Sequence, residues 1–435
     1  MAKNLKPSGF IDYNPEKQKI FDELKKIIEK NYSKFWFVNI ETPSVENNSV
    51  LTAKWWDEVA KQVFGLYWLA QWASDAKKYS LHFDLTVPFA RYAIEYEEDI
   101  KFPFKRYQIQ KVFRWERSQK WRYKEFYQCD IDIVWETISE FYDVEIIETL
   151  YNSLQNILEF LNINSKAIVH LNNKYLIESL IEKFEIENGK EFFKLLDDYY
   201  KLEKQDFENK LKELSPNNSL EILEILKKDL NEIIELLKDS KYIEQITELQ
   251  SIYNTLKNRW VNVVFDPYIT RWLDYYTWVV FETFIEDYQN FGSVCSGGRY
   301  DNLVGAIRKA TNSKWTELAW VGWSIWLSRL FSLLEENNLL NKKLNLTDII
   351  VFNLWCSNDY REKIINSLKN TSKTFDIYYN KAKLDKQFKY AENKNIRYWI
   401  FAGESEEEKN EIMIKDLENR TSEVVKINKL ESYFG

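Results

Sequence analysis

The stretch that decides the fold is "RYQIQKVFRWERSQKWRYKEFYQCDIDIV", residues 106–134. It contains two strand-like runs, "RYQIQKVFRWE" and "KEFYQCDIDIV", joined by the polar loop 116–123. Two such runs with a short polar connection predict a β-hairpin. One letter is out of place, because Trp121 stands at a tight basic turn where a small residue is expected.

The polar side chains of this hairpin indicate a binding site. Alternation along a strand places Arg114 and Glu116 on one face of the first run. It also places Gln128, Asp130 and Asp132 on one face of the second run, where they could hold an ammonium group. An arginine can pair with a phosphate through two parallel hydrogen bonds, and an aromatic ring can stack on a base. Taken alone, the segment is equally compatible with a solvated, charged hairpin.

Length and composition indicate a globular protein of two or three domains. Of the 435 residues, 45% are apolar and 29% are charged. No apolar run approaches the ~18 residues of a membrane helix, and the N-terminus has no signal-peptide core. Three widely spaced cysteines indicate reduced thiols in a cytoplasm. The net charge of −8 argues against a protein coated with nucleic acid, but a local basic face stays possible.

The order of elements predicts a sheet domain with an insertion and a separate C-terminal domain. Asn14 and Pro15 predict the start of a helix. The segment 80–96 is expected to run from strand through Pro88 into helix, and "CSGGRYD" (295–301) to form a turn. Residues rich in Lys, Glu, Leu and Ile from about 173 to 258 predict a helical insertion. The β-α-β-α-β pattern after the linker at 337–346 predicts a small α/β domain.

Further candidate site residues lie outside the hairpin. "FDLT" (83–86) places Asp84 and Thr86 on one face, "RWLDYYTW" (271–278) contains Arg271, and Arg329 ends a strand-to-helix segment. No glycine-rich phosphate loop occurs, so arginines would have to hold a nucleotide. The two histidines, His82 and His170, are not beside a candidate nucleophile, which makes a histidine general base improbable. Such a site suits acyl or nucleotidyl transfer by positioning and charge stabilisation.

Together these segments resemble the histidyl-tRNA synthetases, a family of class II aminoacyl-tRNA synthetases, over nearly the whole chain. The resemblance rests on "FDLTVPFARY" (amino-acid-binding strand), "FRWERSQKWRYKEFYQCDID" (motif 2), "RWLDYYTW" and "CSGGRYD" (the two histidine-specific signatures), "WVGWSIWLSRL" (motif 3) and "KLDKQFKYAENKNIRYWIFAGE" (anticodon-binding domain). It implies an α+β fold, in which a class II antiparallel-sheet catalytic domain with a helical insertion precedes a C-terminal α/β anticodon-binding domain. The expected boundaries are 1–172 and 259–336 for the catalytic domain, 173–258 for the insertion and 345–435 for the anticodon-binding domain.

The resemblance also implies a role for each matching site residue. Arg271 and Arg114 would be catalytic, near the α-phosphate. The residues implied for histidine binding are Asp84, Leu85, Thr86, Arg114, Gln128, Asp132, Arg271, Tyr275, Tyr276 and Tyr300. Those implied for ATP binding are Arg114, Glu116, Arg122, Phe126 and Arg329. Asp132 would accept a hydrogen bond from the imidazole N–H. A side chain without such a donor would leave a buried group unpaired and would therefore be rejected.

The resemblance implies ATP-dependent activation of L-histidine to histidyl-adenylate, followed by transfer of the histidyl group to tRNA(His). It also implies a homodimer that is located in the cytoplasm and is not associated with a membrane. Mg²⁺ would accompany ATP, held mainly by phosphates and water, and its protein ligands are not assigned. The alternative is the non-catalytic paralogue that regulates ATP phosphoribosyltransferase in histidine biosynthesis. That paralogue typically lacks the anticodon-binding domain and has eroded signatures. A different class II synthetase is disfavoured by the LDYY and GGRYD segments.

The tryptophan and glycine contents are both unusual. Glycine accounts for only 10 residues and tryptophan for 17, whereas a usual share of about 7% would give roughly 30 glycines. Against the family pattern, eleven tryptophans stand where glycine is expected: Trp36, Trp55, Trp56, Trp68, Trp72, Trp121, Trp272, Trp278, Trp320, Trp323 and Trp326. We hypothesise that the gene comes from a bacterium that decodes UGA as glycine. The alternative is a genuinely tryptophan-rich variant.

Overall fold

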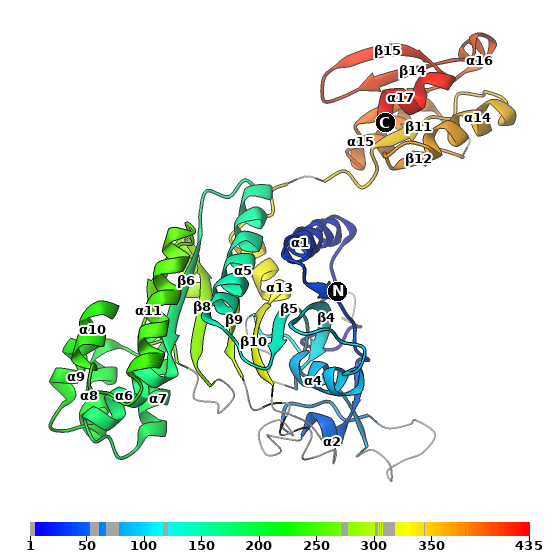
Figure 1. Ribbon diagram of the computed structural model, residues 1–435. Coiled ribbons are helices and arrows are strands. Elements are labelled where there is room, and N and C mark those ends of the chain that lie inside the picture. The colour runs from blue at the N-terminus through cyan, green and yellow to red at the C-terminus, as the bar shows by residue number, and fades with distance from the viewer. Residues whose placement is uncertain are drawn as a thin grey trace. The chain divides into compact units, whose positions relative to one another are not determined.

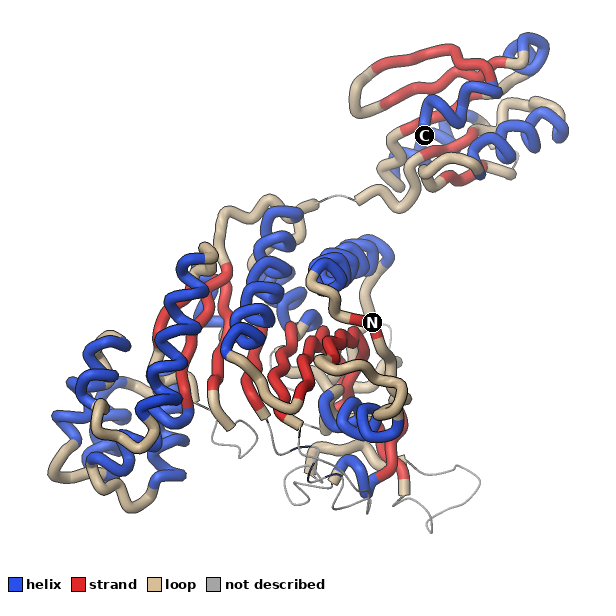
Figure 2. Tube along the Cα trace, viewed as in Figure 1, coloured by secondary structure: helices blue, strands red, loops and turns tan. Residues whose placement is uncertain are grey.

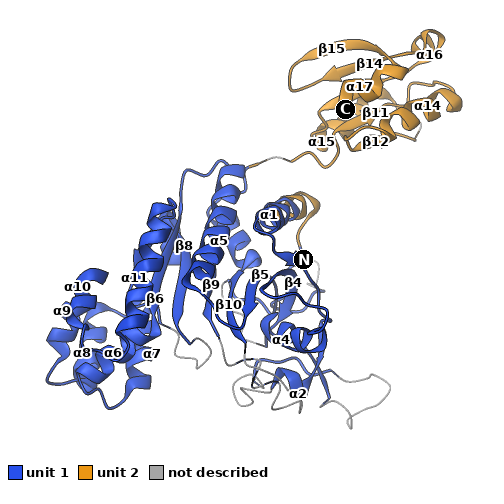
Figure 3. Cartoon of the chain, viewed as in Figure 1, with its two compact units in different colours: residues 1–12, 22–341 blue, residues 13–21, 342–435 orange. Residues whose placement is uncertain are grey.

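The computed structural model divides the chain into two compact units (Figure 3), formed by residues 1–12 with 22–341 and by residues 13–21 with 342–435. The structure describes residues 5–52, 61–66, 78–115, 121–270, 277–300, 303, 305, 307, 318–342, 344–380 and 382–435. None of the helices in these described ranges is long and apolar enough to cross a membrane.

An eight-stranded sheet forms the centre of the first unit (Figure 1). In spatial order its strands are β1 (Val38–Asn39), β4 (Phe104–Phe113), β5 (Glu125–Trp135), β10 (Ala319–Ile325), β9 (Cys295–Arg299), β8 (Val279–Ile285), β6 (Ala167–Asn173) and β7 (Val263–Phe265). The two outer pairs are parallel, and the neighbouring strands between them are antiparallel. A small second sheet pairs β2 (Val45–Asn47) with β3 (Tyr79–Leu81).

The predicted hairpin is confirmed as the antiparallel pair β4 and β5. Its strands are long, and the inner part of β5 from Gln128 to Val134 is buried throughout. Neighbours on both sides cover this segment, since β5 pairs with β4 on one side and with β10 on the other. The hairpin therefore brings its polar side chains into the interior of the unit.

Helices cover this sheet (Figure 2). They are α2 (Asn48–Leu51), α4 (Thr86–Glu95), α5 (Glu140–Phe160), α13 (Leu327–Glu336) and, of α1 (Pro15–Lys34), the part from residue 22 onward. Asn14 caps α1 as predicted, since its side chain accepts a hydrogen bond from the N–H of Lys17 at 2.9 Å. Near the other end of α1, the hydroxyl of the buried Tyr32 donates to the carbonyl of Cys129 at 2.8 Å. Helix α1 is thereby held against the middle of β5.

The predicted helical insertion is present between β6 and β7. It comprises α6 (Lys174–Lys183), α7 (Gly189–Asp197), the short η1 (Tyr199–Lys201), α8 (Lys204–Leu214), α9 (Ser219–Ile225), α10 (Leu230–Leu236) and α11 (Ile243–Asn258). A buried ion-pair network holds α11 to the sheet. Arg299 of β9 contacts Asp143 of α5, and its Nη2 also donates to Glu248 of α11 at 3.0 Å.

The second unit contains a five-stranded sheet in the order β12 (Phe375–Ile377), β11 (Ile349–Val351), β13 (Tyr398–Phe401), β14 (Glu411–Asp416) and β15 (Thr421–Lys426). Its helices are α14 (Asn358–Lys369), α15 (Leu384–Asn393), α16 (Glu404–Lys409) and α17 (Leu430–Phe434). The first three strands in sequence are parallel and alternate with α14 and α15, as predicted. The antiparallel addition of β14 and β15 was not predicted.

Two predictions about local structure were wrong. Residues Cys295–Arg299, which were predicted to form a turn, form the buried strand β9. Their small residues allow close approach of the neighbouring strands, since a Cβ at Gly297 would overlap the backbone carbonyl of Gly322 in β10. Pro88 does not lie in a strand, because β3 ends at Leu81 and Pro88 falls in the first turn of α4. A proline suits a first helical turn, where its missing N–H leaves no bond unmade.

Candidate active site

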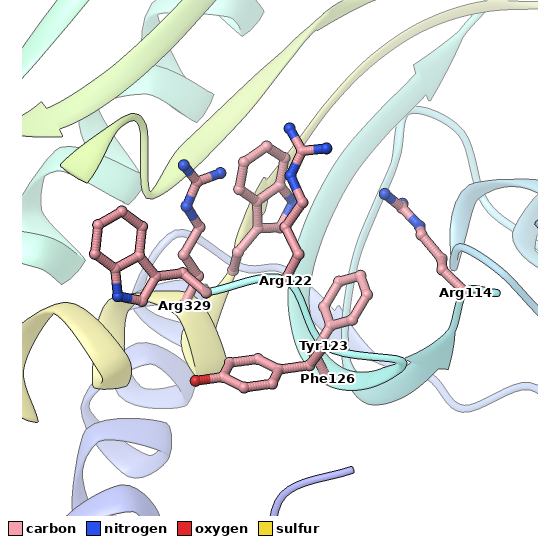
Figure 4. Close-up of a pocket in the computed structure, with 7 residues that line it drawn as sticks. Arg114, Arg122, Tyr123, Phe126 and Arg329 are labelled. Atoms are coloured by element: carbon pink, nitrogen blue, oxygen red, sulfur yellow. The ribbon is translucent and has the colours of Figure 1, made fainter. Parts of the chain in front are cut away.

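A pocket of about 230 Å³ opens at the end of the β4–β5 hairpin (Figure 4). Its lining residues are Arg114, Trp121, Arg122, Tyr123, Phe126, Trp326 and Arg329. Four of the five residues predicted for ATP are therefore gathered here from the hairpin and from α13. The fifth, Glu116, lies outside the described residues. Three guanidinium groups beside an aromatic ring suit a phosphate chain carrying a base.

Arg114 connects this pocket to the interior of the sheet. It follows β4 directly, and its Nε donates to the carbonyl of Phe83 at 2.9 Å. Its Nη2 lies 3.4 Å from the side-chain oxygen of Gln128, and its guanidinium carbon lies 5.2 Å from the centre of the Phe126 ring. One arginine can thus contact groups in the pocket and groups at the end of β5.

Arg329 enters the pocket from the first turn of α13. Its Nη2 donates to the carbonyl of Phe291 at 3.2 Å. The close approach requires the neighbouring glycine, because a Cβ at Gly292 would lie 2.5 Å from the same nitrogen. Gly292 also has a φ of +89°, a left-handed backbone that favours glycine. Two indole rings stand beside this arginine, since Trp326 lies 5.3 Å from it and Trp121 packs on Phe291.

A row of buried polar side chains runs from the pocket along both strands of the hairpin. The register pairs Gln110 with Gln128, Gln108 with Asp130, and Arg106 with Asp132. Successive members are linked, because the Gln128 amide donates to Asp130 at 3.2 Å. Directly opposed residues on one face of an antiparallel pair interact strongly. The row therefore forms a continuous polar wall within the sheet.

Asp132 lies at the inner end of this row. Its Oδ2 lies 2.6 Å from Nη2 of Arg106, which is fully buried. On the other side its neighbour in β10 is Gly322. A Cβ at Gly322 would overlap both Oδ1 of Asp132 and the hydroxyl of Tyr300. Glycine at this position therefore lets the Asp132 carboxylate and Tyr300 approach each other.

The segment Asp84–Thr86 lies beside the row, at the N-terminus of α4. Oδ1 of Asp84 accepts a hydrogen bond from the N–H of Val87 at 3.1 Å, and the carbonyl of Leu85 lies 3.5 Å from Nη2 of Arg106. Burial raises the pKa of Asp84 to about 6, against the lowering effects of that hydrogen bond and of Arg114. The predicted ammonium-binding residues Asp84, Thr86 and Gln128 thus belong to segments that Arg114 connects.

Three of the predicted histidine-binding residues, Arg271, Tyr275 and Tyr276, lie outside the described residues. Sequence reasoning missed one further residue, Arg106. A signal for it was present, because Arg106, Gln108 and Gln110 alternate on β4 as Gln128, Asp130 and Asp132 do on β5. An antiparallel hairpin must bring two such polar faces together.

Comparison with known proteins identifies the family. The family model "Histidyl-tRNA synthetase" matches residues 9–322, and the model "Anticodon binding domain" matches residues 348–435. The chain belongs to the histidyl-tRNA synthetase family. It is 37% identical to the histidine–tRNA ligase of Finegoldia magna, over 97% of each chain, and 35% identical to that of Clostridium tetani, over 96% of each. Its structure resembles the crystal structure of histidyl-tRNA synthetase from Nostoc sp. PCC 7120, with a TM-score of 0.84, 26% identity and 99% coverage of each chain.

Both histidines of this synthetase are engaged in contacts away from the arginine pocket. Nε2 of His82 lies 2.7 Å from the carbonyl of Lys111, and burial lowers the pKa of His82. Nδ1 of His170 lies 2.6 Å from Oδ2 of Asp266, which also accepts a hydrogen bond from the hydroxyl of Tyr200. These contacts support the expectation that neither histidine acts as a general base.

The environment of Asp132 predicts a pH-dependent stability for the unliganded synthetase. Burial raises the pKa of Asp132 to about 8, with Arg106 acting in the lowering direction and Asp130 and Asp84 in the raising one. The folded state therefore keeps this proton at a pH where the unfolded chain, with an ordinary pKa of about 4, has lost it. The free energy of unfolding should fall as the pH rises from about 4 to about 8.

The Asp132→Asn variant tests this pH dependence. An asparagine cannot release a proton, so the change in melting temperature between about pH 5 and pH 8 should be smaller than in the parent chain. Thermal unfolding at both pH values in the two proteins measures the difference. The variant can differ in absolute stability, because it also changes the contact between residue 132 and Arg106. An equal pH-dependent change in the two proteins would contradict the assignment to Asp132.

Proposed function

We propose that the chain binds L-histidine along the buried polar row and ATP in the arginine pocket, and joins them as histidyl-adenylate. As a histidine–tRNA ligase, it then transfers the histidyl group to tRNA(His). The observation that carries the proposal is the position of Arg114. This side chain lines the pocket and reaches Gln128 at the end of the row. The reacting carboxylate and the α-phosphate would meet at this arginine.

The chemistry at this point needs no general base. A histidine carboxylate oxygen attacks the α-phosphorus of ATP, a C–O–P linkage forms, and the bond to the leaving pyrophosphate breaks. The carboxylate is already ionised at neutral pH, so no proton has to be removed. Arg114 would stabilise the charge on the α-phosphate, and Arg329 would hold the γ-phosphate end. Arg271, the second proposed catalytic residue, would act beside Arg114. In the second step a ribose hydroxyl of the tRNA attacks the acyl carbon, an ester bond forms, the bond between the acyl carbon and the phosphate oxygen breaks, and the hydroxyl proton is released with the departing AMP.

We assign the histidine side of the reaction to the inner part of the row. Asp84, Thr86 and Gln128 would bind the α-ammonium group, and Asp132 with Tyr276 would bind the imidazole. The support from the described residues is burial and charge. Asp84 and Asp132 are both nearly inaccessible to solvent, where an unpaired carboxylate is costly and a cationic or N–H donor ligand is favoured. Tyr275 and Tyr300 would complete the pocket wall, with Leu85 beside them.

The adenine side is assigned to the outer part of the pocket. Phe126 would stack on the base, Glu116 would accept from the adenine amino group, and Arg122 would contact phosphate. Mg²⁺ would accompany ATP and reduce the charge of its phosphates. Within the described ranges the structure gathers no group of three or more acidic, histidine or cysteine side chains that could hold a metal ion.

The proposed domains correspond to the catalytic and the tRNA-binding functions. We propose a catalytic domain of 1–172 and 259–336, an insertion of 173–258 and an anticodon-binding domain of 345–435. The match of an anticodon-binding model to 348–435 favours a ligase over the regulatory paralogue, which typically lacks that domain. A homodimer is proposed from the family alone. A cytoplasmic location is proposed from the three buried, unbridged cysteines and from the family.

The basic segment 381–397 is proposed to contact tRNA, although two of its cations are paired within the same unit. Lys394 lies 3.2 Å from Asp376, and Arg397 pairs with Asp416 at 2.8 Å. These two cations are therefore partly neutralised within the unit. Lys383, Lys386 and Lys389 of the same segment are exposed on and beside α15, whereas Lys381 lies outside the described residues. Exposed lysines near a phosphate backbone supply sequence-independent affinity.

Arg114→Ala tests the catalytic assignment. Loss of one preorganised charge-stabilising contact should lower histidine-dependent ATP–pyrophosphate exchange by on the order of 10²–10³. The measurement uses the chain with glycine at the eleven tryptophan positions named above. Arg259→Ala is the matched control, because Arg259 forms a half-exposed pair with Glu148 away from the pocket. Exchange within tenfold of the control would reject the role of Arg114.

The double variant Lys386→Glu, Lys389→Glu tests the tRNA contact. Reversing two exposed charges should weaken aminoacylation through a higher KM for tRNA and reduce its salt dependence. Pyrophosphate exchange should stay within about twofold, because the reversal lies outside the pocket. The control is Lys363→Glu, Lys369→Glu on α14, which changes the net charge of the same unit equally. Equal losses in the two double variants would contradict the assignment to α15.

A further inference from the structure

Two helices end in the same hydrogen-bonded motif, with tryptophan at its left-handed position. After α1, the N–H of Trp36 donates to the carbonyl of Ser33, and the N–H of Phe37 to that of Tyr32. After α11, the N–H groups of Trp260 and Val261 make the equivalent bonds to Lys257 and Leu256. The φ values of the two tryptophans are 67° and 62°. This motif ends helices with a left-handed residue that is usually glycine and sometimes asparagine.

The same chain meets this requirement with asparagine at three other helix ends, and with Glu185, whose φ is 50°, after α6. Asn162, Asn338 and Asn395 follow α5, α13 and α15, have positive φ, and make the same pair of bonds. Asparagine tolerates this backbone because its short side chain bonds locally, whereas a large side chain is strained there. Burial gives no compensation, because Trp36 is 86% exposed and Trp260 is 90% exposed.

Two further tryptophans adopt the same backbone outside helix ends. Trp121, in the hairpin loop that lines the arginine pocket, has a φ of 67°, and Trp355 has a φ of 69° and is 63% exposed. Within the described ranges, tryptophan occupies four left-handed positions and glycine only two, Gly9 and Gly292. Glycine is the residue that adopts this conformation without steric cost.

Trp323 has no positive φ, but its side chain overlaps a neighbouring side chain. It lies directly opposite Gly297 in β9, and Gly297 lies directly opposite Phe281 in β8. The rings of Trp323 and Phe281 both extend over this glycine and overlap each other. The space above one glycine holds one ring. If residue 323 is glycine, the Phe281 ring alone occupies the space above Gly297.

Trp399 has none of these features. It is 5% exposed, its indole N–H donates to the carbonyl of Ile396 at 3.0 Å, and its ring packs against Phe352 and Phe388. A buried tryptophan with a bonded N–H is a well-placed tryptophan. The structure thus separates tryptophans that fit from tryptophans that do not.

We propose that residues 36, 121, 260, 323 and 355 are glycine in the native protein, inserted at a UGA codon that is written here as tryptophan. Positions 260 and 355 add to the eleven inferred from the family pattern. Trp278, Trp320 and Trp326 are singled out by neither a positive φ nor an overlapping ring, and Trp55, Trp56, Trp68, Trp72 and Trp272 lie outside the described residues. Glycine at 121 would remove an indole from the arginine pocket and leave more room for ATP.

Tandem mass spectrometry of the protein from cells that carry the gene natively tests the proposal. Peptides covering the five positions should contain glycine, and the peptide covering residue 399 should contain tryptophan. Tryptophan at positions 36 and 260 would overturn the proposal. A second measurement uses the recombinant chain. Trp36→Gly with Trp260→Gly should raise the melting temperature by a few degrees, because the left-handed strain is relieved. The control Trp399→Gly should lower it, and a lowered value for both would contradict the backbone argument.

A second inference rests on the buried cation opposite Asp132. Arg106 is fully inaccessible to solvent, and its guanidinium carbon lies 4.2 Å from the centre of the Phe89 ring. Its Nη1 donates to Gln108 at 3.3 Å, and its Nη2 lies 2.6 Å from Asp132. These contacts orient the two terminal nitrogens of the guanidinium group toward Gln108 and Asp132. A planar, permanently charged group with fixed donors is well suited to hold a carboxylate in place.

We infer that Arg106 is a positioning residue that favours ionisation of the Asp132 carboxyl group and orients it toward the imidazole of histidine. This inference rests on the proposed function. The groups that face Asp132 with charge are Arg106 from β4, Asp130 from β5 and Asp84 from the segment before α4. The two carboxylates and burial oppose ionisation of Asp132, and Arg106 favours it. Tyr300 adjoins the other oxygen, and β10 contributes only Gly322 at this point.

The variants Arg106→Met and Arg106→Lys test the positioning role in steady-state pyrophosphate exchange. The methionine variant should raise the KM for histidine by on the order of 10²-fold and leave the KM for ATP within about twofold. The pH at which histidine binding reaches half its maximum should move upward, because Asp132 then loses its proton at higher pH. The lysine variant keeps the charge and should recover part of both effects, which a merely structural role would not produce.

Lys105→Met is the matched control, because the adjacent Lys105 is partly exposed and pairs with Glu145. An unchanged histidine KM and pH profile in the methionine variant would overturn the inference while exchange by the parent chain still supports the proposed function. Absence of histidine-dependent exchange in the parent chain would instead reject the proposed function itself. If the methionine variant does not fold, as judged by its melting temperature, the lysine variant decides, and a parent-like pH profile there counts against the inference.

Discussion

The burial of charged groups in the middle of a sheet is the constraint on which this structure depends. Asp130 and Asp132 lie on a strand that has neighbours on both sides, where an isolated carboxylate would be strongly disfavoured. Arg106 on the adjacent strand supplies the compensating charge at 2.6 Å from Asp132. The pairing register of β4 and β5 is fixed by the same contact, because a shift by one residue would turn the polar row to the other face. The row in turn determines where Arg114 meets Gln128 at the edge of the arginine pocket.

Close approach between backbone and side chains is the second requirement of the site. Gly322 gives Asp132 and Tyr300 their space, and Gly292 gives Arg329 its path to the pocket. A protein with so few glycines would be expected to keep them at such positions. The tryptophans with positive φ do not fit this expectation, because they occupy positions where a large side chain is strained and, at Trp36 and Trp260, is exposed to solvent. Decoding of UGA as glycine would explain both the low glycine and high tryptophan contents of the sequence and the positive φ values at these tryptophan positions.

Much of the architecture could be predicted because it depends on local patterns. The hairpin, the helical insertion and the alternating C-terminal elements all follow from periodicity, capping and turn residues. The strand β9 was missed because its Ser-Gly-Gly sequence has turn character, and only the neighbouring strands β8 and β10 make it a strand. The role of Arg106 was missed because it needs the register between two strands. The pairing of Lys394 and Arg397 could not be predicted, because their partners, Asp376 and Asp416, are 18 and 19 residues away in the sequence.

The central claim is that the buried row selects histidine and the arginine pocket activates it. Amino-acid-dependent ATP–pyrophosphate exchange, measured with each standard amino acid on the chain carrying glycine at the tryptophan positions, tests this claim most directly. The account predicts rapid exchange with histidine and at least about a hundredfold less with any side chain that lacks an N–H donor of that shape, because the buried Asp132 would lose its hydrogen bond to the substrate. Exchange that is equal for histidine and another amino acid, or absent with histidine, would contradict it.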